Sequence, residues 1–277
     1  WKESRAVSRT DAGNYLNFGV REFAMTAIAN GVALHGGFIP YSGTFLIFME
    51  YARNAVRLAS LMGLHNIFVY THDSVALGED GPTHQPVEQL TNLRTTPKLS
   101  VWRPCDTVET AIAWRAAIAR SGPTALVLTR QKTKAQTRSA ETLAQVERGG
   151  YVLQRETAPL AAIIIATGSE VALAVAAANV LMSEAVGVRV VSMPSTDMYL
   201  AQDDAYRETV LPNAMRARVA VEAAHPDYWY RFVGLDGAVV GIDRFGLSAP
   251  GAQALEALGM TVDSVVAAVR RVIGARR

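Results

Sequence analysis

Cysteine is almost absent from this 277-residue sequence, which contains a single one, Cys105. An intrachain disulfide is therefore excluded, and a reducing, intracellular compartment is the simplest home for the chain. No uninterrupted apolar run reaches the ~18 residues that a membrane span needs. The longest, residues 171–182, is bracketed by Glu170 and Glu184, and the first four residues do not form a signal peptide. We therefore expect a cytoplasmic protein that makes no contact with a membrane.

A strong charge of one sign is also missing. The 27 basic and 25 acidic residues leave a formal net charge of +2, and no dense tract of Lys and Arg occurs. The largest local excess, at residues 131–138, is typical of a polar connection, so we expect no nucleic-acid partner. Half of the residues are hydrophobic and 19% are charged, as in an ordinary globular protein. At ~150 residues per domain, the length predicts two domains.

Apolar strands and helices alternate in two blocks, which predicts two consecutive α/β domains with mostly parallel sheets. In the first block we expect strands at 15–20, 66–71, 99–103 and 125–129, and helices at 21–34, 45–62, 86–93 and 107–120. In the second we expect strands at 161–166, 188–192, 218–223 and 238–242, a helix that residues 167–170 open, and a last helix at 261–274. Residues 168–170 could bind an anion at this helix start, but capping is the commoner role. A polar stretch that ends in Gly149 and Gly150 predicts a linker. The resulting limits are 1–135 for the first domain, 136–150 for the linker and 151–277 for the second domain.

Glu22 lies where an expected strand meets an expected helix, and apolar residues surround it. The helix N-terminus favours the charged carboxylate, whereas desolvation disfavours it. A raised pKa would suit an acid that donates a strong hydrogen bond to a ligand nitrogen. A surface carboxylate that simply begins the helix is the other interpretation, and the local sequence by itself favours it.

Three aromatic residues, Phe45, Phe48 and Tyr51, recur at every third position of an expected helix. Such a stripe could hold a flat heteroaromatic ring by stacking. An aromatic stripe is more often part of a hydrophobic core, and this second interpretation stays open.

The expected strand at 66–71 leads into a loop that carries His72, Asp80 and His84. Proteins with α/β sheets place ligand-binding groups at the carboxyl ends of their strands. Acid–base catalysis or hydrogen bonding to a polyol fits these residue types, and a metal site is conceivable, although the histidine spacing is irregular. Arg130 follows another expected strand. It is either a residue that binds an anion such as phosphate or an exposed arginine of the linker.

Taken together, these segments resemble the transketolase family. The first block contains FGVREFAM (18–25), PYSGTFLIFMEYARNAVRLA (40–59), YTHDSVALGEDGPTHQPVEQL (70–90), WRPCD (102–106) and TRQ (129–131). The second contains ATGSEV (166–171), RVVSMPSTD (189–197), YWYRFVGLDGAVVGIDRFG (228–246) and SAP (248–250). The resemblance covers essentially the whole chain from Trp1. It implies a pyrimidine domain of the thiamine-diphosphate-binding fold that lacks its start, followed by a transketolase C-terminal-like domain.

The resemblance also implies roles for the candidate residues. Glu22 matches the glutamate that hydrogen-bonds the aminopyrimidine N1′ of thiamine diphosphate and so activates the cofactor. The aromatic residues match the pocket that holds the pyrimidine ring. His72 and Arg130 match residues at the substrate phosphate, Asp80 matches the aspartate at the donor's C2 hydroxyl, and His84 matches a histidine at the donor's reacting end. In the family, a two-carbon ketol unit passes from a ketose phosphate such as xylulose 5-phosphate to an aldose phosphate, in the pentose phosphate pathway.

Part of the family's machinery is absent from this sequence. The N-terminal diphosphate-binding domain, whose Gly-Asp-Gly…Asn motif holds the diphosphate and Mg²⁺ or Ca²⁺, has no counterpart here, so we expect no metal ligand in this chain. The family forms homodimers whose active sites combine the pyrimidine-binding domain of one subunit with the diphosphate-binding domain of the other. We therefore expect the isolated chain to be inactive. Leu247 replaces a common Glu of the family, at a position expected to lie far from the chemistry.

Two other functions fit the same motifs. A dihydroxyacetone synthase shares them and would use formaldehyde as the acceptor. A non-catalytic or split C-terminal subunit would pair with a separately encoded diphosphate-binding half.

Overall fold

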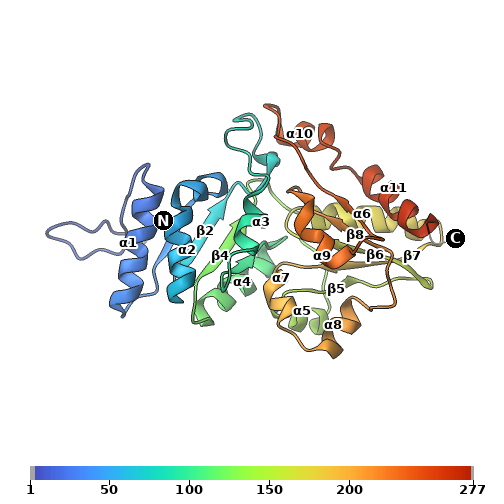
Figure 1. Ribbon diagram of the computed structural model, residues 1–277, viewed down its shortest axis with the longest axis horizontal. Helices are drawn as coiled ribbons and strands as arrows, with labels where there is room; N and C mark the ends of the chain where they lie inside the picture. Colours follow the sequence, from blue (N-terminus) through green and yellow to red (C-terminus); the bar gives the residue numbers. More distant parts are fainter. Residues whose placement is uncertain (1–3, 276–277) are drawn as a thin grey trace.

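Short apolar strands and the helices between them build two sheets in the computed structural model, which describes residues 4–275 (Figure 1). Trp1, where the family resemblance begins, lies outside the described residues. The first sheet is parallel, in the order β1-β2-β4-β3, with strands β1 (Tyr41–Phe45), β2 (Ile67–Thr71), β3 (Ser100–Trp102) and β4 (Thr124–Leu128). Its helices and 3₁₀ turns are α1 (Glu22–His35), η1 (Leu46–Phe48), α2 (Met49–Met62), η2 (Val75–Leu77), α3 (Gln89–Arg94) and α4 (Thr107–Ala119).

Two expected elements at the start of this half are wrong. Residues 15–20 form no strand: Tyr15 makes one isolated bridge to Ala6, and Val20 is exposed. The expected helix at 45–62 begins later, because Tyr41–Phe45 is extended and pairs in register with β2. Pairing with a buried neighbouring strand is a tertiary effect, and it overrides local propensity here.

The second sheet has the order β5-β7-β6-β8-β9, and only β5 is antiparallel. Its strands are β5 (Tyr151–Gln154), β6 (Leu160–Ala166), β7 (Gly187–Ser192), β8 (Arg218–Val221) and β9 (Ala238–Val240). Its helices are α6 (Glu170–Ser183), α7 (Thr196–Leu200), α8 (Asp204–Val210), α9 (Tyr230–Val233), α10 (Gly251–Ala257) and α11 (Val262–Gly274), with η4 at Pro226–Trp229. The predicted linker contains α5 (Ala140–Gln145) and η3 (Val146–Arg148), and β5 was not predicted. The predicted fold class, two α/β domains with mostly parallel sheets, is confirmed.

The core of the second domain lies on both faces of its sheet. Along β6, Ile163 and Ile165 pack with Trp229 and its neighbours, whereas Ile164 packs on the opposite face with residues of α6 and α11. Successive side chains of a strand point to opposite faces, so a strand covered on both sides is apolar throughout. This explains why the apolar run at 161–166 could be predicted as a strand.

One segment, Gly251–Gly274, has the length and mean hydropathy (1.3) of a membrane-crossing helix, although no uninterrupted apolar run was expected. The segment is not one straight helix. Gly259 adopts a positive φ of 82°, and the Thr261 side chain accepts a hydrogen bond from Ser264 N, which caps a new helix. Helix α11 then packs against α6 and the sheet. The stretch is therefore the last core element of the second domain.

The two domains meet through polar contacts and through apolar packing of Val75, Val87 and Cys105 against the second core. At the start of β3, Ser100 Oγ and Val101 N donate to the carboxylate of Asp197 on α7, at 2.7 and 3.0 Å. Helix α10 reaches back from the second domain and packs on η2 of the first, which Figure 1 shows as the red helix beside the loop at the top of the molecule. The second domain thereby touches the loop that follows β2.

Candidate functional site at the carboxyl ends of the first sheet

Three neighbouring strands of the first sheet end at the same level. Phe45, the last residue of β1, is paired in register with Thr71, the last residue of β2, and Thr71 with Leu128, the last residue of β4. His72 and Arg130 follow these ends directly. Because the carboxyl ends of parallel strands are where α/β sheets bind ligands, these residues mark the candidate site.

A row of ring contacts joins the aromatic residues to both loop histidines. The ring of Phe45 stacks on His72, with centroids 3.7 Å apart, and lies nearly parallel to the ring of Phe48 at 5.9 Å. Phe48 in turn contacts Tyr51 at 6.0 Å and the edge of His84 at 5.3 Å. We call these five residues the aromatic row. Tyr51 is exposed and the two phenylalanines are half-buried, so the row reaches the surface instead of closing into the core.

His72 adopts an unusual backbone conformation, with φ at 60°. A residue other than glycine is strained in this region, and such strain persists only where the surroundings enforce it. Its Nδ1 lies 2.9 Å from Thr71 Oγ1. Burial and the cation of Arg130 lower the pKa of His72, while the carboxylates of Asp80 and Asp73 act in the opposite direction. The imidazole is therefore biased toward its neutral form, which can accept or donate one hydrogen bond.

Residues 72–85, named here the site loop, carry Asp80 and His84. The loop begins with η2, where the Ser74 side chain accepts a hydrogen bond from Ala76 N, and it reverses at glycines with positive φ. Asp80 is exposed, and His84 Nδ1 lies 2.9 Å from Thr83 Oγ1. Asp80 is therefore accessible to a ligand, whereas the half-buried His84 ring is held between Thr83 and Phe48.

Arg130 is exposed at the end of β4 and has no ion-pair partner among residues 4–275. The neighbouring atoms Thr129 Oγ1 and Gln131 Oε1 are buried, yet within that part of the chain neither has a hydrogen-bond partner. Those two atoms are inaccessible, so the exposed guanidinium of Arg130 is the group at this strand end that can bind an anion.

Glu22 is the first residue of α1 and is half-buried. Within the described chain its side chain makes no hydrogen bond or ion pair, and no direct contact joins it to the aromatic row. Helix α1 packs on α2 and β1, and the Asn30 side chain fastens it by a 2.8 Å hydrogen bond to Ala55 O. A five-residue connection leads from its end to the start of β1, so its beginning faces the carboxyl end of that strand.

Sequence reasoning missed a buried group of charges behind the site loop. Arg103 is fully buried, and its Nε donates to Asp73 Oδ2 at 2.9 Å, next to His72. Its Nη1 lies 2.5 Å from Glu170 Oε2 and 3.3 Å from Glu222 Oε1, both in the second domain. Arg103 stands inside the motif WRPCD, but nothing in the local pattern indicates acidic partners 67 and 119 residues away.

Residues 167–170 open a helix as expected, with Ser169 at the N-cap of α6, but the expected capping by a side chain is wrong. Ser169 makes no side-chain cap; its hydroxyl donates to Glu170, and Glu170 pairs with Arg103. Gly168 has a φ of 57°, and a Cβ there would stand 2.6 Å from the Arg103 guanidinium carbon. Residues 167–170 therefore form part of the interface between the two domains.

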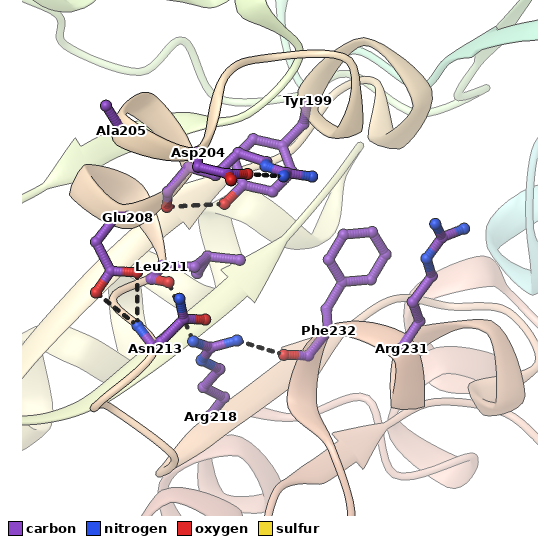
Figure 2. A pocket seen from close by; sticks show the side chains of 10 residues that line it. Tyr199, Asp204, Ala205, Glu208, Leu211, Asn213, Arg218, Arg231 and Phe232 are labelled. Atoms are coloured by element: carbon purple, nitrogen blue, oxygen red, sulfur yellow. Dashed lines mark hydrogen bonds and ion pairs between the residues drawn. The ribbon is translucent and has the colours of Figure 1, made fainter.

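No group of three or more His, Cys, Asp or Glu side chains between residues 4 and 275 is placed to hold a metal ion. A cavity of about 610 Å³ does exist in the second domain, and Figure 2 shows its lining. Of its arginines, Arg207 pairs with Asp204 and Arg218 donates to Phe232 O, which leaves Arg231 exposed. None of the residues expected from the sequence lines this cavity, so it is separate from the candidate site.

Comparison with known proteins places the two domains in one family. The model "Transketolase, pyrimidine binding domain" matches residues 2–136, and "Transketolase-like TK C-terminal domain" matches residues 149–261. Transketolase 1 of Escherichia coli (strain K12) is 59% identical over 274 residues, which are 99% of this chain and 41% of that protein. The chain thus spans about two fifths of the length of the curated relatives it matches.

Solved structures agree in fold. Transketolase from Leishmania mexicana has a TM-score of 0.93 at 44% identity, over 98% of this chain and 40% of that one. A structure described as "Split gene transketolase, inactive beta4 tetramer" has a TM-score of 0.76 at 24% identity, over 95% of this chain and 85% of that one. At this identity the second likeness is one of fold alone.

Proposed function

The chain belongs to the transketolase family and corresponds to its C-terminal part, and from this premise we propose that it supplies the pyrimidine-binding half of a ketol-transferring site. The observation that carries the proposal is the aromatic row. It links residues expected to hold a cofactor ring, Phe45 and Phe48, to residues expected to meet the sugar, His72 and His84. A two-carbon unit would pass there from a ketose phosphate to an aldose phosphate.

Thiamine diphosphate fits the residues that the first domain presents. Half-buried rings that reach the surface suit a flat heteroaromatic ring, which Phe45, Phe48 and Tyr51 would hold. Glu22 is an unpaired, half-buried carboxyl group at a helix start, and it would hydrogen-bond the pyrimidine nitrogen. When bound, the cofactor supplies the carbanion-stabilising chemistry that no amino-acid side chain provides.

The polar residues of the site suit a sugar phosphate. Arg130 and the mostly neutral His72 would bind the phosphate, since a guanidinium matches an anion in charge and geometry. Asp80 would accept a hydrogen bond from the donor's C2 hydroxyl. His84, at the edge of Phe48, would hydrogen-bond the reacting end of the donor and hold or release a proton there.

The remaining half of the site would come from a diphosphate-binding domain that carries Mg²⁺ or Ca²⁺. Several large apolar side chains on α1, on α2 and in the segments flanking α1 are exposed, namely Val20, Phe23, Leu34, Phe38 and Leu61. Strand β1 is also an uncovered edge of the described sheet. Exposed apolar patches and free strand edges mark surfaces that other protein covers. We assign them to a diphosphate-binding domain in a homodimer of the parent enzyme.

Without that domain the isolated chain should be inactive. A reducing, cytoplasmic setting agrees with Cys105, which is buried and unpaired. The domain limits at 135 and 151 stay a prediction.

Reconstitution tests the proposal. The chain is incubated with thiamine diphosphate, Mg²⁺, xylulose 5-phosphate and ribose 5-phosphate, alone and with the separately produced part of the Escherichia coli relative that this chain does not match, which would carry both the diphosphate-binding domain and the start of the pyrimidine domain. We expect turnover only in the mixture and a loss of ~10²–10⁴-fold in kcat for Glu22→Gln, the range of acid–base contributions. Arg231→Ala, in the separate cavity, serves as the control. Turnover by the chain alone would overturn the missing-half proposal, and an inactive mixture would overturn the assignment of the site.

The acceptor separates the two enzymatic alternatives. If the mixture transfers the ketol unit to formaldehyde in preference to ribose 5-phosphate, the chain is the dihydroxyacetone synthase type.

A further inference from the structure

Gln85, the last residue of the site loop, ties the loop to itself and to the second domain. Its side chain is buried, and Nε2 lies 3.1 Å from Val75 O and 2.8 Å from Gly78 O, at the two ends of η2. The same nitrogen lies 2.9 Å from Leu247 O, 162 residues further along the chain. A single amide group therefore joins three backbone carbonyls from two domains.

Residues 246–251, named here the clamp, lie close against the site loop. At Gly246 a Cβ would stand 1.7 Å from Gln85 Oε1, and at Gly251 it would stand 2.4 Å from Ala76 O. A side chain at Gly246 would have to push the Gln85 side chain aside, whereas one at Gly251 would meet the backbone of η2. Gly251 is thus explained by the close approach of two backbones, and Gly246 by the room that the Gln85 amide needs.

The clamp also reaches the middle of the site loop. Ser248 Oγ donates to Glu79 O at 2.5 Å, directly before Asp80. Helix α10, which begins at the end of the clamp, packs on η2. The expectation that the Leu247 position lies far from the chemistry is therefore wrong, because its carbonyl holds the residue next to His84.

The beginning of the site loop is held from the same domain. Asp73 accepts a hydrogen bond from Arg103, and Arg103 is bound in turn by Glu170 and by Thr167 O at 3.1 Å. The loop itself has only a three-residue turn and a few short-range hydrogen bonds. Its order must come from its surroundings, and both of its ends are fastened to the second domain.

We propose that the second domain positions the site loop, with Gln85 and the clamp as the positioning elements that set where Asp80 and His84 meet the sugar. The proposal rests on the proposed function for the identity of the ligand. It gives the C-terminal domain a role in a site to which it contributes no catalytic residue. A displacement of about 1 Å in a binding group can lower a rate ~10²-fold. Holding the site loop in position should therefore raise the rate of the reaction.

Amide hydrogen exchange on the full chain, without cofactor or sugar, tests the proposal. The variants are Gln85→Ala, which removes the bonds, and Gly246→Ala, which pushes the Gln85 side chain away. The matched controls are Gln154→Ala, whose amide donates to Asn179 on the surface, and Gly274→Ala, where nothing lies within 4 Å of the added Cβ. We expect exchange of the amides of residues 74–85 to become about tenfold or more faster in both test variants, with β6 to β8 unchanged.

The double variant gives a sharper result. If Gly246→Ala acts only by displacing Gln85, it should add almost nothing once Gln85 is alanine, as expected for coupled neighbours. The imidazole of His72, followed by NMR, should also lose part of its burial, so its pKa should move up toward its ordinary value. A general loss of stability would not produce that local change.

Exchange in residues 74–85 that equals the controls would overturn the proposal, as would full additivity in the double variant. If either test variant fails to fold, Ser248→Ala removes only the bond to Glu79, and unchanged exchange there would count against the clamp. The exchange experiment contains neither cofactor nor substrate, so its outcome does not depend on whether the reconstituted mixture is active. Conversely, unchanged exchange in the test variants would overturn the positioning role of the clamp and leave the proposed function intact.

Discussion

Removing the Arg103 side chain should lower the free energy of unfolding of this chain strongly. Its side chain is fully buried and lies within 3.3 Å of three carboxylates, those of Asp73, Glu170 and Glu222. Arg103→Met keeps an unbranched side chain of moderate size but removes the charge. Three buried carboxylates would then share one nearby cation, Arg94, which pairs with Glu222 at 2.6 Å.

The size of the effect follows from the burial. Removing one partner of a buried ion pair costs roughly 3–5 kcal/mol, because the charge left behind stays desolvated. Folded domains are stable by only about 5–15 kcal/mol, so the variant should lose a large share of its stability. Urea unfolding at neutral pH measures this loss, and an unchanged m-value would show that the unfolding reaction itself is the same.

The loss of unfolding free energy in Arg103→Met should become smaller as the pH falls. Burial acts to raise the pKa of Glu222, but Arg94, and after it Arg103, outweigh this effect and hold the pKa below its usual range. A carboxyl group with a lowered pKa contributes stability above its ordinary pKa of about 4.3 and loses it as the pH falls through the folded value. The difference between wild type and Arg103→Met should therefore shrink in acid.

An exposed arginine provides the control. Arg115 pairs with Glu147 on the surface, where the two side chains are 65% and 57% exposed, so Arg115→Met should change stability by less than about 1 kcal/mol. If Arg103→Met is as mild as this control, the charge group does not hold the domains together and the reasoning is wrong.

Three further predictions concern single residues. Arg130→Ala should raise the pKa of His72, because a cation that lowers it is gone; NMR titration of the imidazole checks this. Gly168→Ala should destabilise the chain by about 2–4 kcal/mol in urea, since its Cβ would meet the fixed guanidinium of Arg103 and φ is positive. Asn30→Ala should cost about 2 kcal/mol and speed amide exchange in α1, because it leaves the Asn66 amide without its acceptor.

Elements whose structure is determined by their own residues could be predicted from the sequence. The runs that became β2, β4 and β6 are short, apolar and rich in β-branched residues, as strands covered on both faces must be. The last helix, expected at 261–274, is α11, and the structure shows Thr261 as its N-cap. The site loop was also found correctly as the segment after β2, although the roles of its residues stay predictions.

Elements decided by distant partners could not be predicted. Phe45 shares the aromatic spacing of Phe48 and Tyr51, and pairing of Tyr41–Phe45 with β2 makes it the end of a strand instead. Residues 15–20 have a strand-like composition, but none of the described strands lies beside them. In both cases the deciding hydrogen bonds come from outside the segment, and local propensity holds no information about them.

The candidate site likewise contains residues that local sequence predicts and residues that only distant contacts reveal. The side chains that could touch cofactor or sugar all lie in the first 130 residues and stand in recognisable motifs. The groups that hold them, namely Glu170, Glu222, Leu247 O and Ser248, lie more than 65 residues away from the loop residues and arginine that they bind. A sequence motif marks the residues of a site because the chemistry needs particular side chains at fixed positions. A residue that only holds a site loop in place needs no more than a carbonyl, a glycine or a carboxylate at the right point in space. Such residues leave almost no local sequence pattern, so contacts in the folded chain are needed to find them.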